Sequence, residues 1–149
     1  MIMKYKLTDE TMTTESGVSL HRIECVCSFG NVKAGDNGGW IEREENLSQY
    51  GSAEMYGNAE VYGSSRVSGS SRVSGNAVID NINDYIVFKN NWSSGRYFTW
   101  TRSNDMWKVC CFYGTGKDLI EKAYKDSNSS GDCYKAYVEL VEKLKELQK

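Results

Sequence analysis

Three columns of residues in the middle of the chain recur at a strict interval of six. A repeat of fixed length decides the architecture of a chain before other signals are weighed. Neither the 3.6-residue period of a helix nor the two-residue period of a strand explains this interval. The columns are Gly51, Gly57, Gly63, Gly69 and Gly75, then Met55, Val61, Val67, Val73 and Ile79, then Ala53, Ala59, Ser65, Ser71 and Ala77.

A chain that turns a corner every six residues explains the period. One apolar side chain then points inward on each face, a small residue fills the space beside the corner, and glycine accepts the turn. The repeat, from about Leu47 to Ile82, therefore predicts a short β-helix of about two coils. With three hexapeptides per coil, residues eighteen apart should stack about 4.8 Å from one another. The predicted pairs are Met55 with Val73, Val61 with Ile79, and the opposite charges Glu54 with Arg72 and Arg66 with Asp84.

The residues before the repeat predict a hairpin and a cover. Residues 3–7 and 18–29 have strand-like patterns on either side of the polar turn Thr8–Gly17. A β-helix cannot leave its apolar cross-section open to water, so terminal residues must shield it. We expect Trp40 and Ile41, after the glycine-rich segment that begins at Asn31, to do so.

The residues after the repeat predict strands followed by two helices. Tyr85–Phe88 should be a strand, and Arg96–Arg102 and Met106–Tyr113 should form a hairpin. Thr115 with Asp118 predicts a helix start, and that helix should end near Asp126. Ser129 with Asp132 predicts a second start, for a helix that ends at about Leu147.

The composition of the chain limits the classes of partner that it is expected to bind. The formal net charge is −2, which predicts no general affinity for nucleic acid or for anionic membranes. Residues 83–149 hold 11 Lys and Arg against 9 Asp and Glu, so a small anionic ligand should meet this part. No stretch approaches the roughly 18 apolar residues that cross a bilayer. Five cysteines without a signal peptide predict a cytoplasmic protein with reduced thiols.

The repeat resembles the hexapeptide-repeat family of left-handed β-helix proteins. Its lines are MYGNAE, VYGSSR, VSGSSR and VSGNAV. The segments KYKL, NVKAGDNGGWIE and NLSQYG resemble one subgroup of bacterial and prophage proteins, over roughly residues 4–82. The resemblance implies a left-handed coil and a homotrimer. Better-known relatives are trimeric acyltransferases with a catalytic histidine on a coil, whereas the only histidine here, His21, precedes the repeat.

The predicted fold is thus mainly β with an α+β C-terminal cap. It places an N-terminal hairpin and β-helix cover in residues 1–46 and a short left-handed parallel β-helix of about two coils in 47–83. Residues 84–149 form the C-terminal α+β domain, with strands and then two helices. Outward tyrosines along the first coil are candidates for the oligomer contact, namely Tyr50, Tyr56 and Tyr62.

Several motifs have a structural interpretation that we favour over a chemical one. His21 lacks the partners of a catalytic triad, so a partly buried polar side chain is the preferred interpretation over a general base. Cys25 with Cys27, and Cys110 with Cys111, lack zinc-site spacing, which favours buried thiols and no metal or other cofactor. Gly114–Lys117 ends like a phosphate loop, but Cys111 and Asp118 break the pattern, which favours a capped helix start.

The densest candidate binding site combines aromatic and basic side chains. Arginines that flank aromatic rings could stack a base and pair with a phosphate. We favour the alternative, in which Phe98 and Trp100 belong to the core beneath the helices, with the arginines at its rim. Trp92, in a loop of Asn, Ser and Gly, is a candidate anchor for a partner. The candidate site residues are Trp92, Arg96, Phe98, Trp100, Arg102 and Lys108.

Three functions remain open from the sequence. The first is a non-enzymatic oligomeric binding protein, with a phage-encoded inhibitor that captures a host defence protein or its nucleotide signal as its concrete form. The second is an acyltransferase-like enzyme that uses His21 or a residue of a neighbouring subunit. The third is a structural phage component.

Overall fold

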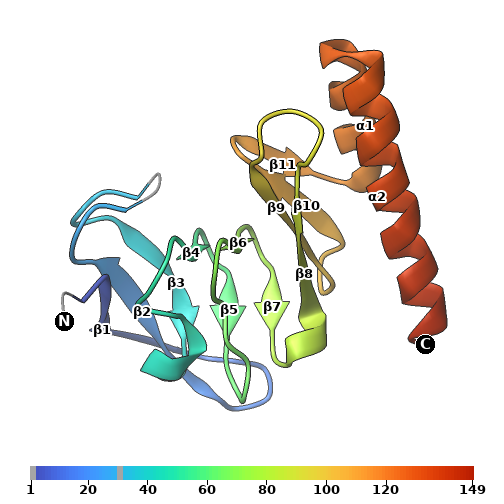
Figure 1. The fold of residues 1–149 in the computed structure, drawn as a ribbon. Helices are drawn as coiled ribbons and strands as arrows, with labels where there is room; N and C mark the ends of the chain where they lie inside the picture. The colour runs from blue at the N-terminus through green and yellow to red at the C-terminus, as the bar shows by residue number, and fades with distance from the viewer. Residues whose placement is uncertain (1–2, 30–31) are drawn as a thin grey trace.

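The computed structural model describes residues 3–29 and 32–149. The chain is mainly β with two helices at its C-terminal end, which confirms this part of the predicted fold class. The N-terminal strands lie at one end, the repeat lies in the middle, and a second sheet and both helices lie at the other end (Figure 1). Asn31, where the predicted glycine-rich segment begins, lies outside the described residues.

The N-terminal strands form an antiparallel pair. β1 (Tyr5–Thr13) pairs with β2 (Ser19–Cys25), with a register shift between Leu7 and Thr11. The predicted turn Thr8–Gly17 is wrong in its first half, because the chain continues as a strand to Thr13. Thr8 supports the longer strand, since its Oγ1 donates to the carbonyl oxygen of Arg22 at 2.8 Å.

β3 (Asn37–Ile41) joins the hairpin to the repeat. It pairs antiparallel with β2 and parallel with β5 (Glu60–Val61), where Ile41 lies opposite Val61. Trp40 and Ile41 are both buried. Ile41 belongs to the core cluster of the repeat and covers its apolar interior, as the sequence predicts. Trp40 lies opposite Glu60 on the other face of β3, where its ring centroid is 4.4 Å from Cζ of Arg22, so the prediction is wrong for Trp40.

Residues eighteen apart pair in parallel along the repeat, as predicted. β4 (Glu54–Met55) pairs with β6 (Arg72–Val73), and β5 pairs with β7 (Val78–Ile79). Met55 thus lies opposite Val73, and Val61 opposite Ile79. The whole apolar column is at most 3% exposed, and the five corner glycines have φ between 60° and 69°.

The charge pairs on the outside of the repeat are partly as predicted. Nε of Arg72 lies 3.6 Å from Oε2 of Glu54, so this pair forms. The predicted pair of Arg66 with Asp84 is wrong. Two short 3-10 turns flank the repeat, η1 (Glu44–Asn46) and η2 (Ile82–Asp84). Within η2, Oδ2 of Asp84 instead accepts the backbone N–H groups of Asp80 and Asn81.

The second sheet has the strand order β11-β10-β9-β8. Its strands are β8 (Tyr85–Lys89), β9 (Tyr97–Thr101), β10 (Met106–Val109) and β11 (Phe112–Gly114). The predicted β8 strand and the hairpin of β9 with β10 are confirmed. The predicted strand Met106–Tyr113 is wrong as one element, because it breaks at Cys110 and Cys111, where Cys110 has a φ of 51°.

Two helices cover one face of this sheet. In α1 (Gly116–Asp126), Oγ1 of Thr115 accepts the N–H of Asp118, which confirms the predicted start. α2 (Asn128–Leu147) begins earlier than predicted, because Ser127 rather than Ser129 caps it. Neither helix in the described part of the chain could span a bilayer. The core between sheet and helices contains Phe98, Trp100, Trp107, Leu119, Ala123, Tyr134 and Val141.

The other face of the second sheet closes the free edge of the repeat. A parallel stack ends in a row of unpaired backbone groups, which must be covered or paired. Here four side chains meet that row, two as acceptors and two as donors. Oγ1 of Thr99 and Oγ of Ser103 accept the N–H groups of Arg72 and Val78, and the hydroxyls of Tyr85 and Tyr113 donate to the carbonyls of Arg66 and Ser74.

Candidate functional site

Phe98 and Trp100 do not form a ligand-binding face. They are 1% and 0% exposed and lie in the core between the sheet and the helices. The ring of Phe98 lies edge-on to those of Tyr134 and Tyr137 in α2. The prediction that they stack a ligand is therefore wrong, and the alternative that they are core is confirmed.

Trp92 also packs against a helix. Its ring stacks on Tyr137 with centroids 5.8 Å apart, and its indole N–H donates to Oγ of Ser130. Oδ1 of Asn90 accepts the N–H groups of Trp92 and Ser93, which folds the loop back onto α2. The prediction of an exposed partner anchor is wrong, because most of its indole surface faces the molecule's own core cluster.

Arg102 has a structural position. Its guanidinium lies over the ring of Trp100, 5.3 Å from the centroid. It donates to the carbonyl of Asn83 and to the side chain of Gln148. Arg102 thus ties the C-terminal end of α2 to the sheet and does not join the other predicted cations.

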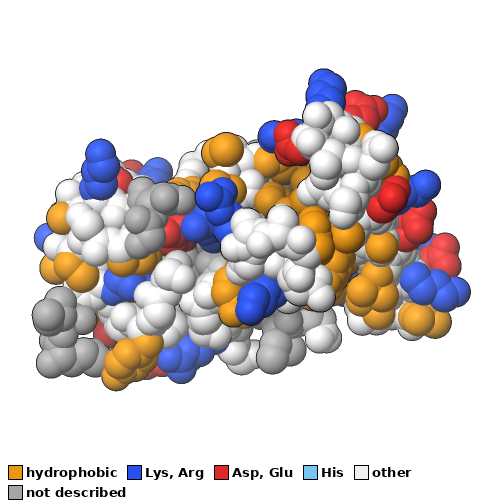
Figure 2. Space-filling view, turned by 45° about the horizontal axis from the view of Figure 1, so that its top comes forward, with side chains coloured by type: hydrophobic (Ala, Val, Ile, Leu, Met, Phe, Trp, Pro, Cys, Tyr) orange, Lys and Arg blue, Asp and Glu red, His pale blue; other side chains and the backbone are white. Residues whose placement is uncertain are grey.

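Arg96 and Lys108 come together with Arg72 of the repeat. Arg72 and Arg96 line a cavity of about 170 Å³ together with Ser52, Ser70 and Tyr97. Lys108 approaches from β10 and interacts electrostatically with Arg72. We call the five residues that line this cavity, together with the neighbouring Lys108, the basic cleft. In the space-filling view, Lys and Arg side chains lie in the middle of the molecule, between the hairpin end and the helices (Figure 2).

The basic cleft carries an excess of positive charge. Glu54 balances Arg72, but within residues 3–29 and 32–149 neither Arg96 nor Lys108 forms an ion pair with a carboxylate. Nζ of Lys108 lies 5.7 Å from the centroid of the Tyr56 ring. Burial, and then the charge of Arg72, lower the pKa of Lys108. An anion that enters the cleft would relieve this repulsion.

The predicted oligomer tyrosines lie in different surroundings. Tyr50 is 66% exposed. Tyr56 donates its hydroxyl to Oε2 of Glu54 and lies beneath Lys108. Tyr62 lines a separate cavity between the hairpin tip and the repeat. Their role in an oligomer contact stays a prediction.

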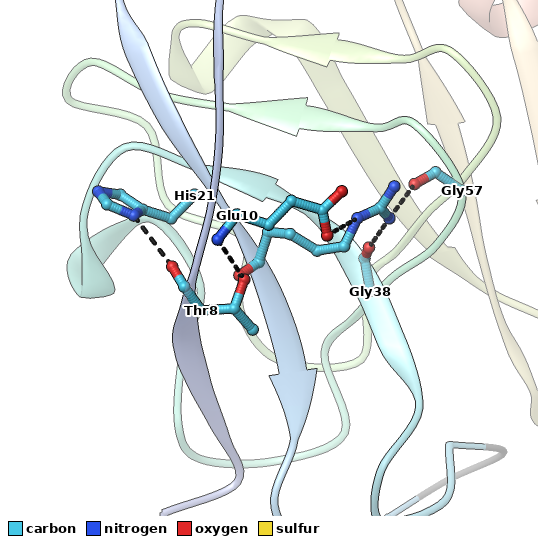
Figure 3. Close-up of polar contacts among 6 residues, drawn as sticks. Thr8, Glu10, His21, Gly38 and Gly57 are labelled. Carbon is cyan, nitrogen blue, oxygen red and sulfur yellow. Dashed lines mark hydrogen bonds and ion pairs between the residues drawn. The ribbon is translucent and has the colours of Figure 1, made fainter.

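His21 lies in a network of backbone and side-chain contacts at the hairpin. Its Nδ1 is 3.2 Å from the carbonyl oxygen of Thr8 (Figure 3). The neighbouring Arg22 donates to the carbonyl of Gly38 at 2.8 Å and pairs with Glu10 at 3.4 Å. The His21 ring is therefore held by main chain, as expected of a partly buried polar side chain.

The remaining motifs also have structural positions. Thr115 caps α1, so Gly114–Lys117 is a capped helix start. Over the part of the chain that the structure describes, no group of three or more His, Cys, Asp or Glu side chains could hold a metal ion. All five cysteines are free. The prediction of buried thiols is confirmed for Cys25 and wrong for Cys111, which is exposed, while Cys27 and Cys110 are half-buried.

Sequence reasoning missed Arg72, Ser52, Ser70 and Tyr97 as members of the site. The six-residue period could place Ser52 and Ser70 in one outward column, and Glu54 and Arg72 in the next. No local signal indicates that the second sheet docks against this face. A scan of protein-family models and a search of curated proteins both give no match to the chain. The resemblance to hexapeptide-repeat proteins therefore stays a prediction.

Proposed function

We propose that the chain is a non-enzymatic binding protein that captures a small phosphorylated ligand, of the nucleotide class, in the basic cleft. The observation that carries the proposal is the convergence of Arg72, Arg96 and Lys108, with Glu54 as the paired carboxylate. Three cations against one carboxylate leave the cleft positive in a protein whose formal net charge is −2. A phosphate group supplies the missing negative charge.

The other residues of the cleft suit a nucleotide. Arginine binds phosphate through two parallel hydrogen bonds, and serine hydroxyls such as those of Ser52 and Ser70 can add neutral ones. The ring of Tyr97 is 44% exposed at the edge of the cleft, where a base could stack on it. Tyr97 thus takes the stacking role that the sequence analysis assigned to Phe98 and Trp100.

The scaffold of the proposal is a short left-handed β-helix of about two coils, assembled as a homotrimer. The parallel register at eighteen residues and the corner glycines support the coil. A trimer would present three basic clefts, with Tyr50 as an exposed contact. A phage-encoded inhibitor that sequesters the nucleotide signal of a host defence system is the concrete form. The backbone contact of His21 supports a role without catalysis.

The test is native mass spectrometry followed by calorimetric titration. The protein is purified gently from an expression strain, and its oligomeric mass and any bound mass are read together. Inorganic pyrophosphate, a nucleoside diphosphate and a cyclic dinucleotide are then titrated at two salt concentrations. We expect at least one to bind once per chain, with weaker binding at high salt.

Variants locate the site. Arg96→Met and Lys108→Met should each weaken binding by about 10-fold or more, because a hydrogen bond to a charged group contributes about 1.5–3 kcal/mol. Lys89→Met is the matched control, since Lys89 is an exposed cation of the same sheet outside the cleft. Absence of binding by all three probes, or equal losses in the control, would show that the proposal is wrong.

A further inference from the structure

Cys110 has an unusual position among the five cysteines. Its sulfur accepts a hydrogen bond from Nη1 of Arg96 at 2.9 Å. Its φ of 51° is one of two positive values at non-glycine residues in the described chain. Such backbone conformations are costly and are concentrated at functional sites. The next residue, Cys111, carries a second thiol that lines the same cavity as Cys110.

The charges around Cys110 favour its thiolate. Partial burial opposes ionisation, but the N–H of Cys111 and the charges of Arg96 and Arg72 outweigh it, so the pKa of Cys110 is lowered. Lys108, from the same strand end, also interacts with Cys110. The groups that face it from the helices are Tyr134 of α2, and Lys122 and Asp126 of α1, which line the adjoining cavity.

A cavity of about 190 Å³ opens beside both thiols. Val109, Phe112, Leu119 and Ala123 supply its apolar walls. Lys122 pairs with Asp126 at 3.5 Å, whereas Arg96 has no carboxylate partner among the described residues that line the cavity and supplies its excess positive charge. The cavity therefore has room for a small molecule and a preference for a negatively charged one.

We propose that Cys110 is a site of thiol–disulfide exchange with anionic low-molecular-weight disulfides, and that Cys111 is its resolving thiol. The Cys110 thiolate attacks one sulfur of the disulfide, a Cys110–S bond forms, the S–S bond breaks, and the released thiolate takes a proton from water. The thiolate of Cys111 then attacks Cys110, which forms a Cys110–Cys111 disulfide and releases a second thiol. In sum, one dithiol and one disulfide give one protein disulfide and two thiols.

The product should be easy to reduce. Adjacent Cα atoms across a trans peptide are about 3.8 Å apart, whereas the Cα atoms of ordinary disulfides are about 4.4–6.8 Å apart. A bond between neighbours is therefore strained, and strained disulfides are the labile, regulatory ones. Because Cys110 contacts Arg96, its oxidation removes a thiolate partner from one cation of the basic cleft.

The test uses the reduced full chain and oxidised glutathione, followed by intact-mass spectrometry. The native chain should pass through a glutathione adduct to a species that has lost two hydrogens. Cys111→Ser should accumulate the glutathione adduct, because it lacks the resolving thiol. Cys110→Ser should react more slowly than the native chain. Cys133→Ser is the control and should react as the native chain does. Cystamine, a cationic disulfide, should react at least several-fold more slowly.

A second readout separates charge from folding. Arg96→Met should slow the exchange and move its pH midpoint upward, while circular dichroism of the variant stays native. Reaction of Cys111 before Cys110, equal rates in Cys110→Ser and the native chain, or equal rates with cystamine would overturn the proposal. None of these readouts involves nucleotide binding, so this proposal and the proposed function can fail separately.

Discussion

The backbone N–H of Arg72 donates a hydrogen bond to Oγ1 of Thr99 at 3.1 Å, across 27 residues of sequence. Arg72 lies in β6, on the free edge of the repeat, and Thr99 lies in the centre of the second sheet. Thr99 is 1% exposed, so the acceptor side of this hydrogen bond is buried. One hydroxyl thus terminates the parallel stack at this point and fixes how the two parts of the protein dock.

Thr99→Val should destabilise the protein by about 1–3 kcal/mol, because valine keeps the shape but leaves the half-buried N–H of Arg72 without its acceptor. Urea unfolding measures the loss. Thr11→Val, on the exposed face of β1, is the matched control and should change stability by less than about 0.5 kcal/mol. Equal effects at the two positions would contradict the role of Thr99 in closing the edge.

The corner glycines should differ in their tolerance of alanine. Gly51 and Gly69 have φ of 69° and 65°, so alanine carries a backbone cost of roughly 1–2 kcal/mol at either position. A Cβ on Gly51 would also lie 3.0 Å from the carbonyl oxygen of Gly69, whereas a Cβ on Gly69 meets nothing within 4 Å.

Gly51→Ala should therefore destabilise the protein by about 1 kcal/mol more than Gly69→Ala, since overpacking adds to the backbone term. Thermal unfolding of the two variants side by side gives the difference. A larger loss for Gly69→Ala would contradict the predicted stacking of one corner on the next.

The repeat could be predicted from the sequence in detail because its signal is periodic. Six-residue spacing fixes which side chains point inward, and a coil of three hexapeptides fixes which residues face one another. The boundaries of the helices have no such periodic signal. The predicted helix start at Ser129 is wrong because Ser127 offers the same capping chemistry two residues earlier.

The candidate site could be predicted only in part because it joins distant segments. Arg96 and Lys108 are within the predicted aromatic and basic cluster, but Arg72 comes from the repeat. The alternation of β9 places Phe98 and Trp100 on one face, yet it does not reveal that helices cover that face. Only the docking of the second sheet decides which side chains line the basic cleft.

Glu54→Gln should weaken the fold and strengthen anion binding. Glu54 is 1% exposed and pairs with Arg72 at 3.6 Å, so loss of its charge should reduce stability by about 1–3 kcal/mol. The same change removes the negative charge beside the basic cleft. Binding of inorganic pyrophosphate should therefore tighten several-fold.

The double variant Glu54→Gln with Arg72→Met provides the control for the ion pair. If the two side chains are energetically coupled, the sum of the stability losses in the two single variants should exceed the loss in the double variant by about 0.5–3 kcal/mol. Additive losses would mean that Glu54 acts through other contacts. Weaker pyrophosphate binding in Glu54→Gln would contradict a positive cleft.

Glu60→Gln should stabilise the protein at neutral pH and lose this advantage in acid. Burial, and then the nearby charge of Glu15, raise the pKa of Glu60 above its usual 4.5. The native state therefore favours protonated Glu60, so stability falls as the pH rises from the unfolded pKa through the folded one. Glutamine stays neutral and avoids this loss.

Chemical unfolding at pH 7 and below pH 4 should show the Glu60→Gln variant as more stable than the native chain only at pH 7. The control Glu45→Gln, at an exposed position, should leave stability unchanged at both pH values. An equal gain at both pH values would mean that packing, rather than charge, explains the effect.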